Sequence, residues 1–411
     1  MKVIIDARSK FSLAKIYSVQ LFERILRQFN EMKAGVDVSI IISNEQNPKV
    51  LLGKRFLSRY KIKHQFISSN DPIQHVIRSH TQNEKSLILL EGDAIYDERI
   101  LSALITSDKA VIVKDGERNV PLAVRLDTTQ IRDISTSTGS IHDSLTKFTD
   151  SGQLERLEIQ SMQNYIRFLR RSVPPILVRL ESENEIRIIE NVMYANSFKG
   201  TMELVAVYGY RIPVRELTRL TAKTPITPNL VTAAAQICSF GAIPFLAFGW
   251  LWTGLLMAAG FIIFDSLDGK LARMTIRLSK AADKFDHLTS APTRVGWYLA
   301  IGWHLSNGNL SSDIAPFAIA YAAMPVIDKL TGAIFNAKFG RSPLDYTPLD
   351  GKVHLFTVRK NDIFLLLVSM IFGFVKTAYI IAACWAVLTW LWHLYRLIWF
   401  SLFPIHKTGQ K

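Results

Sequence analysis

The stretch Asp265-Ser-Leu-Asp268-Gly269-Lys-Leu-Ala272-Arg273 decides the fold class, because it follows directly on the apolar run 251–264. On a helix, Asp265 and Asp268 are three positions apart, so both carboxylates share one face. Carboxylates at membrane depth are costly and usually face the interior of a helix bundle or a water-filled cavity. Converging carboxylates form the hard oxygen-ligand site that Mg²⁺ or Mn²⁺ prefers.

Other residues of this segment favour a phosphate-bearing ligand. Gly269 leaves room for a ligand to approach the backbone, and Arg273 can neutralise a phosphate. A membrane helix that simply ends in solvent-seeking charges would account for one Asp and one Arg. It would not account for the whole pattern, with Asp283 and Asp286 following in the next segment. The pattern therefore predicts a site for a metal ion and a phosphate.

Apolar runs dominate the chain after about residue 225. A spanning helix needs roughly 20 apolar residues. Six runs are predicted to span a membrane: residues 230–250, 251–264, 295–305 (extended from near 283), 314–335, 363–375 and 377–400. Six spans put both ends of the bundle on one side. The flanking basic residues, from Arg211 to Lys223 and at His406, Lys407 and Lys411, make that side cytoplasmic. Interleaved apolar and basic residues at 214–222 predict an interfacial helix.

The composition supports a membrane protein with a charged N-terminal part. Of 411 residues, 49% are hydrophobic and 20% are charged, which is consistent with segregated apolar runs. The net charge is +14, but many Lys and Arg residues flank apolar segments, which favours an anionic lipid surface over nucleic acid. Cys238 and Cys384 lie in apolar runs and predict neither a disulfide framework nor a metal site. The N-terminus lacks the apolar core of a signal peptide, so the N-terminal part is expected to stay in the cytoplasm.

The first half of the chain alternates strand-like and helix-like segments. Strands are predicted at residues 3–5, 36–42 and 86–90, and a helix over 13–32. Such alternation indicates a mostly parallel sheet covered on both faces. Residues 111–190 contain further strand-like runs, and a helix is predicted near 154–171.

The stretch at 265–273 resembles the signature of the CDP-alcohol phosphotransferase family, DxxDGxxAR followed after about eight residues by GxxxDxxxD. Asp265, Asp268, Gly269, Ala272 and Arg273 match the first half. The likeness extends upstream and downstream, and covers roughly residues 200–400. Residues 227–232, TPNLVT, resemble the start of the family's first membrane helix. Residues 354–361, HLFTVRKN, resemble the basic loop before its fifth.

The second half of the signature departs from the family. Ala282 stands where the Gly is expected, Asp286 matches the third Asp, and Ser290 stands in place of the fourth. A shifted register, which needs a shorter spacer, would use Ser279, Asp283 and His287 instead. The first register is preferred, since residues 285–287, FDH, also resemble the aminoalcohol branch of the family.

The resemblance implies transfer of a substituted phosphate from a CDP-linked lipid or alcohol to a hydroxyl acceptor, with release of CMP. It implies two Mg²⁺ or Mn²⁺ ions and a homodimer, and the pathway would be phospholipid or inositol-phosphodiester biosynthesis. The expected metal ligands are Asp265, Asp268 and Asp286. The expected substrate-binding residues are Gly269, Ala272, Arg273, Ser279, Asn229, Thr232 and Arg359.

The resemblance leaves open which residue is the general base that takes the proton of the acceptor hydroxyl. In the family the fourth Asp is regarded as the base, and Ser290 cannot serve as one at neutral pH. Either His287 or Asp283 replaces it, or a loosely dissociative transfer tolerates a weak base, or catalysis has been lost. The catalytic candidates are therefore Ser290, His287 and Asp283.

The N-terminal half resembles the nucleotidyltransferase domain of two-domain family members that make inositol phosphodiesters. Residues 20–26, QLFERIL, resemble the helix after the nucleotide loop, and residues 90–97, LEGDAIYD, resemble the strand end that carries a metal-binding Asp, here Asp93. Residues 6–15, DARSKFSLAK, contain no glycine, so the loop that cradles a triphosphate is missing. Lys15 alone is weak evidence for a remnant of the lysine of that loop. A turn-forming Gly-Asp explains Asp93 equally well.

These expectations define four segments. Residues 1–197 form a degenerate nucleotidyltransferase-like α/β domain, and residues 198–228 a linker with an interfacial amphipathic helix. Residues 229–402 form an all-α membrane bundle of six transmembrane helices, and residues 403–411 a basic tail. The protein is expected to be multi-pass in the cell membrane, with the N-terminal domain and the active site facing the cytoplasm.

Three functions are compatible with this pattern. The first is a phosphotransferase that uses a CDP-alcohol of the CDP-diacylglycerol or CDP-inositol type and a polyol or polyol phosphate acceptor. The second is an impaired relative that binds metal and CDP-alcohol without turnover. The third is a small-solute transporter with an ion path through Asp265 and Asp268, which is disfavoured because such a path needs neither Gly269 nor Arg273. Nucleic acid is not an expected partner.

Overall fold

A computed structural model describes residues 1–81, 84–115, 120–137, 140–166 and 169–403, without the side chains of residues 49, 54, 55 and 280–287. The chain divides into two compact units. The first comprises Met1–Ile166, Ser172–Asn196 and Met274–Ile276, and the second comprises Arg167–Arg171, Ser197–Arg273 and Arg277–Lys411.

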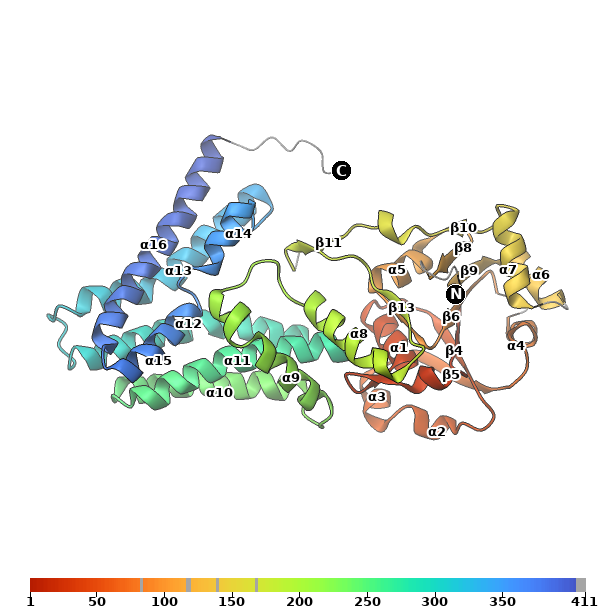
Figure 1. The fold of residues 1–411 in the computed structure, drawn as a ribbon, viewed down its shortest axis with the longest axis horizontal. Helices are drawn as coiled ribbons and strands as arrows, with labels where there is room; N and C mark the ends of the chain where they lie inside the picture. Colours follow the sequence, from red (N-terminus) through yellow and green to blue (C-terminus); the bar gives the residue numbers. More distant parts are fainter. Residues whose placement is uncertain (82–83, 116–119, 138–139, 167–168, 404–411) are drawn as a thin grey trace. The chain divides into compact units, whose positions relative to one another are not determined.

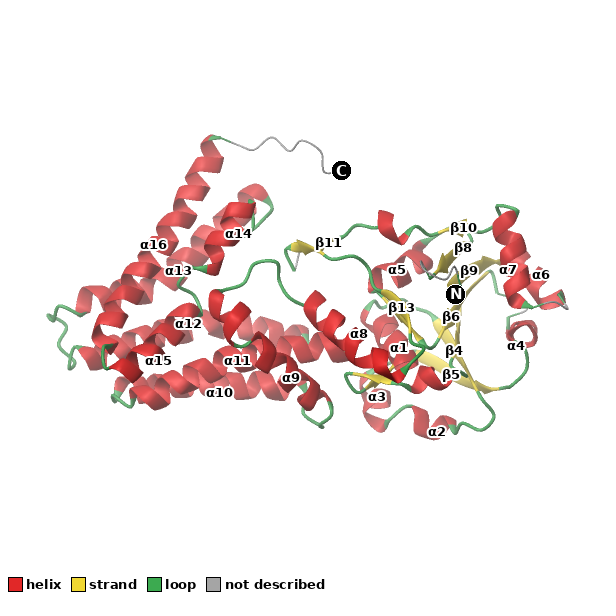
Figure 2. Ribbon diagram, in the orientation of Figure 1, coloured by secondary structure: helices red, strands yellow, loops and turns green. Residues whose placement is uncertain are grey.

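The first unit is built on a mostly parallel sheet, which confirms the expected class (Figures 1 and 2). Seven strands of the described chain lie in the order β10-β8-β9-β6-β1-β4-β5. Their bounds are β1 (Lys2–Asp6), β4 (Asp37–Ile42), β5 (Lys63–Ser68), β6 (Ser86–Glu91), β8 (Val111–Lys114), β9 (Pro121–Asp127) and β10 (Glu155–Arg156). Strand β1 is parallel to both β4 and β6, while β9 runs antiparallel to β6 and β8.

Each face of this sheet carries an apolar core. Ile5, Phe22 and Val38 belong to one cluster, whereas Ile4 and Leu89 belong to the other. Neighbours such as Ile4 and Ile5 separate because successive side chains of a strand point to opposite faces. The helices of this unit are α1 (Leu21–Glu31), α2 (Pro48–Leu51), α3 (Lys54–Arg59), α4 (Ile73–His80), α5 (Glu98–Thr106), α6 (Thr128–Thr136), α7 (Ile141–Asp150) and α8 (Glu183–Asn196), with 3₁₀ turns at Lys10–Leu13 and Ile159–Ser161. Short strands are β2 (Lys15–Ile16), β3 (Val19–Gln20), β7 (Ala94–Tyr96), β11 (Tyr165–Ile166), β12 (Arg171–Ser172) and β13 (Leu177–Arg179).

Two predicted helices of this half are corrected. The predicted helix 13–32 begins only at Leu21, because β2 and β3 form a tight antiparallel pair through Tyr17 and Ser18, both at positive φ. The predicted helix 154–171 is wrong. Its residues form the edge strand β10, a 3₁₀ turn and β11. Leu154 is buried against one face of the sheet and Leu157 is partly buried against the other. The apolar spacing reflects a sheet edge.

The second unit is helical. Its helices are α9 (Arg211–Ala222), α10 (Pro228–Ala247), α11 (Leu251–Thr275), α12 (Lys280–Leu305), α13 (Ala315–Phe339), α14 (Pro348–Leu355), α15 (Asn361–Phe372) and α16 (Val375–Leu402), preceded by a π-helix at Val205–Gly209. Within the described residues, α10, α11, α13 and α16 are long and apolar enough to cross a membrane. The amphipathic segment predicted at 214–222 is helical, as part of α9.

The prediction of six spans is not confirmed. All six predicted runs lie in helices, but α15 has 12 residues and, at 1.5 Å per residue, reaches about 18 Å, short of a hydrocarbon core of about 30 Å. Helix α12 is long but mixes charged residues into its first half. Of the predicted basic tail, residues 404–411 lie outside the described residues, including His406, Lys407 and Lys411.

Candidate functional site

Helix α11 carries the carboxylates of the signature on its final turns. Because α11 continues to Thr275, Asp265 and Asp268 share one helix and one face, as predicted. Both residues are partly exposed, in contrast to the buried Leu267 and Leu271 on the packed side of the helix. The two carboxylates therefore lie on a less tightly packed side of α11 than these leucines.

Asp268 is held by the start of α10. Thr227 caps that helix by accepting from the backbone N–H of Leu230 at 3.3 Å, and Pro228 occupies its first turn. One turn later the buried Thr232 hydroxyl donates to Asp268 Oδ2 at 2.5 Å. The segment TPNLVT thus starts the helix and presents Thr232 to the carboxylate, whereas Asn229 is exposed on the first turn.

Asp265 is paired with a cation from the loop before α15. Lys360 Nζ donates to Asp265 Oδ2 at 2.9 Å, across 95 positions of sequence. Beside this pair lies the buried Glu203, whose Oε1 is 3.8 Å from His354 Nε2 and 4.0 Å from Arg359 Nε. Arg359, a predicted substrate-binding residue, is therefore in the same polar network as the signature.

Burial and neighbouring charges shift the pKa values of three residues of this network, all of which lie outside the candidate membrane spans. Burial alone would raise the pKa of Glu203, but Lys360, Arg359 and His354 lower it to about 2. Burial, helped by Arg359, lowers the pKa of His354 to about 3. Burial opposes the charge of Lys360, but Asp265 and Glu203 raise its pKa above the ordinary value. At neutral pH the network thus holds an ionised Glu203, a charged Lys360 and a neutral His354.

Gly269 and Arg273 lie against one another on α11. A Cβ added at Gly269 would lie 3.3 Å from Arg273 Nη2. A larger residue at 269 would therefore press on the guanidinium. Ala272 is partly exposed on the same helix, and Ser279 is partly exposed just before α12.

The second half of the signature lies on α12. Ser290 is partly exposed there, and its backbone carbonyl accepts from Thr293 Oγ1 at 3.5 Å. The side chains of Asp283, Asp286 and His287 lie outside the described residues. The structure therefore brings together Asp265, Asp268, Thr232, Gly269 and Arg273, and does not describe how the α12 side chains face them.

The donor set suits a hard divalent cation in part. Asp265 and Asp268 offer carboxylate oxygens from one helix face, the ligands that Mg²⁺ and Mn²⁺ prefer. Among the residues with described side chains, no group of three or more His, Cys, Asp and Glu gathers around one point. Two carboxylates with a third expected from α12 fit such an ion.

A buried carboxylate that the sequence analysis missed lies near this site. Asp362, almost fully buried, accepts from Tyr298 Oη at 2.5 Å and from Tyr321 Oη at 2.7 Å. The rings of Tyr298 and Tyr321 stack with centroids 3.7 Å apart. The Tyr379 hydroxyl donates to the Tyr298 carbonyl at 2.6 Å. In the sequence this residue is only a lone Asp at the start of an apolar run. The tyrosines that donate to it lie on α12 and α13, far from it along the chain.

The first unit gathers acidic residues where β1 and β6 end. Asp6 and Glu91 are register partners on these parallel strands. Arg8 forms a bidentate pair with Asp6, with distances of 2.8 Å from Nε and 2.5 Å from Nη2, and Arg179 lies 3.2 Å from Asp93 Oδ2. Burial, then Asp6 and Asp93, raises the pKa of Glu91 to about 7. Asp93 is thus an ion-pair partner, and the predicted choice between metal ligand and turn residue stays open.

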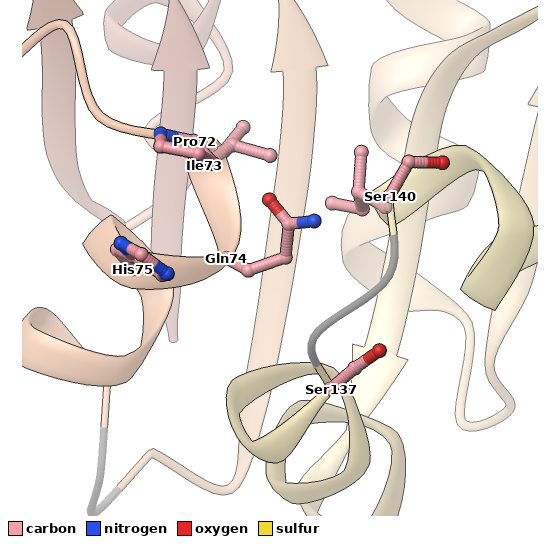
Figure 3. A pocket seen from close by; sticks show the side chains of 7 residues that line it. Pro72, Ile73, Gln74, His75, Ser137 and Ser140 are labelled. Atoms are coloured by element: carbon pink, nitrogen blue, oxygen red, sulfur yellow. The ribbon is translucent and has the colours of Figure 1, made fainter.

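A separate surface pocket lies between the start of α4 and the start of α7 (Figure 3). It is lined by Pro72, Ile73, Gln74, His75, Ser137, Ser140 and Ile141. These seven side chains include no carboxylate and no Lys or Arg. The pocket therefore lacks the groups that the predicted chemistry needs.

Comparisons with known proteins give weak structural likenesses. No family model matches the sequence, and no curated protein matches it significantly. An inositol-1-phosphate CTP transferase from T. maritima is similar over 48% of this chain and 96% of its own, with 11% identity and a TM-score of 0.35. A Mycobacterium tuberculosis phosphatidylinositol phosphate synthase with CDP-DAG bound is similar over 49% of this chain and 100% of its own, with 18% identity and a TM-score of 0.35. TM-scores this low do not establish a shared fold.

Proposed function

We propose that the second unit is a CDP-alcohol phosphotransferase, which moves a substituted phosphate from a CDP-linked lipid or alcohol to a hydroxyl acceptor and releases CMP. The observation that carries the proposal is the face of α11 on which Asp265 and Asp268 lie beside Gly269 and Arg273, with Asp268 fixed by Thr232. These are the residues through which the chain resembles that family.

Asp265 and Asp268 would hold Mg²⁺ or Mn²⁺, together with Asp286 from α12. When bound, such ions neutralise charge that develops on the phosphates. Thr232 orients the Asp268 carboxylate through its hydroxyl hydrogen bond. Arg273 and Arg359 supply fixed guanidinium donors for phosphate oxygens, because a guanidinium matches phosphate geometry. Asn229, Ala272 and Ser279 complete the proposed substrate contacts.

The acceptor hydroxyl must lose a proton as it attacks the phosphorus and as CMP departs. Ser290 has no group that accepts this proton at neutral pH. We assign the role to His287 or Asp283, which lie on α12 with Ser290 and which the preferred register does not use as metal ligands. A loosely dissociative transfer lowers the demand on this base.

The test is CMP release by the full-length protein in nanodiscs. CDP-diacylglycerol and CDP-inositol are supplied in turn, with Mg²⁺ or Mn²⁺ and a panel of polyols and their phosphates. Asp265→Asn should abolish release. Asp313→Asn, the same change at an exposed residue of the α12–α13 loop, should leave it unchanged. Metal-dependent binding of the CDP-alcohol without release across the panel would indicate an impaired relative, and absence of both would reject the proposal.

A further inference from the structure

The last residues of α11 belong to the first unit, although most of this helix belongs to the second. The first unit includes Met274–Ile276, and α11 runs without a break to Thr275. Met274 and Thr275 are both buried. The helix that carries Asp265 and Asp268 therefore ends inside the α/β unit.

The chain leaves α11 through a turn that its own sequence does not favour. Ile276 has a positive φ of 51°, and the Arg277 N–H donates to the Ala272 carbonyl at 2.8 Å. This is the pattern of a Schellman turn, in which the residue with positive φ is usually glycine. A β-branched residue in this conformation is strained and persists only where its surroundings hold it. The end of α11 therefore depends on contacts from elsewhere in the chain.

Two arginines of α1 cap the last turn of α11. Arg24 Nη1 donates to the Met274 carbonyl at 2.7 Å, and Arg27 Nη1 donates to the Thr275 carbonyl. The last carbonyls of a helix have no partner within the helix, and positive charge is favourable beside them. Both arginines are buried, with 6% and 4% of their surface exposed. Burial and the charge of Arg27 lower the pKa of Arg24 only to about 10, so its guanidinium stays charged at neutral pH.

A tyrosine of the first unit holds the strained turn itself. The Tyr60 hydroxyl donates to the Ile276 carbonyl at 2.6 Å. Tyr60 is buried in the apolar core on one face of the sheet, and the Arg27 guanidinium lies 5.2 Å from the centroid of its ring. The groups that hold this turn are thus themselves fixed by the core of the first unit.

We infer that the first unit is a positioning domain for the phosphotransferase site, which caps α11 with Arg24, Arg27 and Tyr60. Asp265 and Asp268 lie about three and two helical turns before this cap. A fixed helix end determines where these carboxylates lie and in which direction the chain leaves toward α12.

This inference rests on the proposed function and gives a role to a unit whose loop at 6–15 lacks glycine. The three capping residues act through α11, so they are positioning residues rather than catalytic ones.

The test measures Mn²⁺ affinity by electron paramagnetic resonance, on the full-length protein in nanodiscs and without turnover. Tyr60→Phe removes one hydroxyl and keeps the ring. The loss of one such hydrogen bond is typically worth about two- to tenfold in an equilibrium constant, and Mn²⁺ affinity should fall by about that factor. The matched control is Tyr96→Phe, because the buried Tyr96 hydroxyl also donates to a carbonyl of the first unit, that of Leu122, at 2.6 Å. The control should lower the unfolding temperature and leave Mn²⁺ affinity unchanged.

A second variant asks whether the turn is what Tyr60 holds. Glycine adopts positive φ without strain, so Ile276→Gly in the Tyr60→Phe protein should restore Mn²⁺ affinity toward the wild-type value. A general loss of stability would not be reversed in this way. Failure of the double variant to recover affinity would count against the inference.

The outcomes separate this inference from the proposed function. Equal Mn²⁺ affinity in Tyr60→Phe and the wild type, or an equal loss in Tyr96→Phe, overturns the inference, and CMP release by the wild type then leaves the proposed function standing. A loss of Mn²⁺ affinity confined to Tyr60→Phe, in a protein that releases no CMP, upholds the positioning role and counts against the proposed reaction. A wild type that binds no Mn²⁺ rejects both.

Discussion

The hydroxyl of Thr232 is a residue-scale feature with a testable consequence. It donates to Asp268 at 2.5 Å, and groups that orient metal-binding carboxylates typically matter by about tenfold to hundredfold in affinity or activity. Thr232→Val should therefore lower Mn²⁺ affinity and CMP release by about tenfold, while Thr232→Ser should stay close to wild type. Mn²⁺ titration followed by electron paramagnetic resonance measures the first effect without turnover. Equal affinities for Thr232→Val and wild type would show that the hydrogen bond is not functional.

Glu91 gives a residue-scale prediction about pH. Its pKa is about 7 in the folded protein against an ordinary value of 4.5, so between these values the native state binds more protons than the unfolded state. Stability must then fall as pH rises from about 4.5 to 7. Glu91→Gln should stabilise the first unit at pH 8 by on the order of 2 kcal/mol and have little effect near pH 4.5.

The measurement is urea unfolding of the full-length protein at pH 8 and near pH 4.5. Proteolytic cleavage within the first unit reports the fraction of that unit that is unfolded. Glu45→Gln, at an exposed position, is the matched control and should be neutral at both. A destabilising effect of Glu91→Gln at pH 8 would mean that the carboxylate is needed charged.

The connecting segment gives a prediction at the scale of an element. Because a Cβ at Gly200 would lie 2.5 Å from the Arg170 carbonyl oxygen, Gly200→Ala forces the two segments apart. Such overpacking typically costs about 1–3 kcal/mol. We expect a lower unfolding temperature. Gly209→Ala, whose Cβ would meet its nearest neighbour at an ordinary 3.8 Å, should be close to neutral, and equal behaviour of the two variants would contradict the packing account.

The strand-end loop of the first unit gives a second element-scale prediction. Residues 6–15 lack the glycines that let a loop wrap a triphosphate, and Arg8 is engaged with Asp6. The full-length protein should therefore release no pyrophosphate from CTP in the presence of phosphorylated alcohols. Release that Asp93→Asn abolishes would show an active nucleotidyltransferase instead.

The elements that the sequence predicts correctly are those that depend on a local pattern of residues. Strands β1, β4 and β6 and the helical continuity of α11 through Asp268 follow from apolar runs of the right length. The segment after Leu154 was misjudged, because a two-residue edge strand takes its identity from its partner β8 rather than from its own periodicity. The hairpin of Tyr17 and Ser18 depends on positive φ angles that neither residue type signals.

At the scale of the whole molecule, the sequence predicts only part of the candidate site. The pair of Asp265 and Asp268 is a short-range pattern, so spacing alone found it. Lys360 and Glu203 meet that site from distant segments, and no local rule predicts such contacts.

The four candidate spans predict how the whole molecule behaves in cells. Helices α10, α11, α13 and α16 are each long enough to cross a bilayer. The full-length protein should remain in the membrane fraction after alkaline carbonate washing and require detergent for extraction. Release by carbonate would show that these helices do not span.

The most direct test of the central claim follows the β-phosphorus of the CDP-alcohol. The full-length protein is incubated with a CDP-alcohol radiolabelled at that atom, a divalent metal and the acceptor panel. Transfer as proposed breaks the bond between the β-phosphorus and the oxygen that leaves with CMP, so the label should appear in a new phosphodiester and CMP should be unlabelled. Asp265→Asn should prevent this and Asp313→Asn should not. Label that stays in the CDP-alcohol under all conditions, or that appears only as hydrolysed phospho-alcohol, would contradict the account.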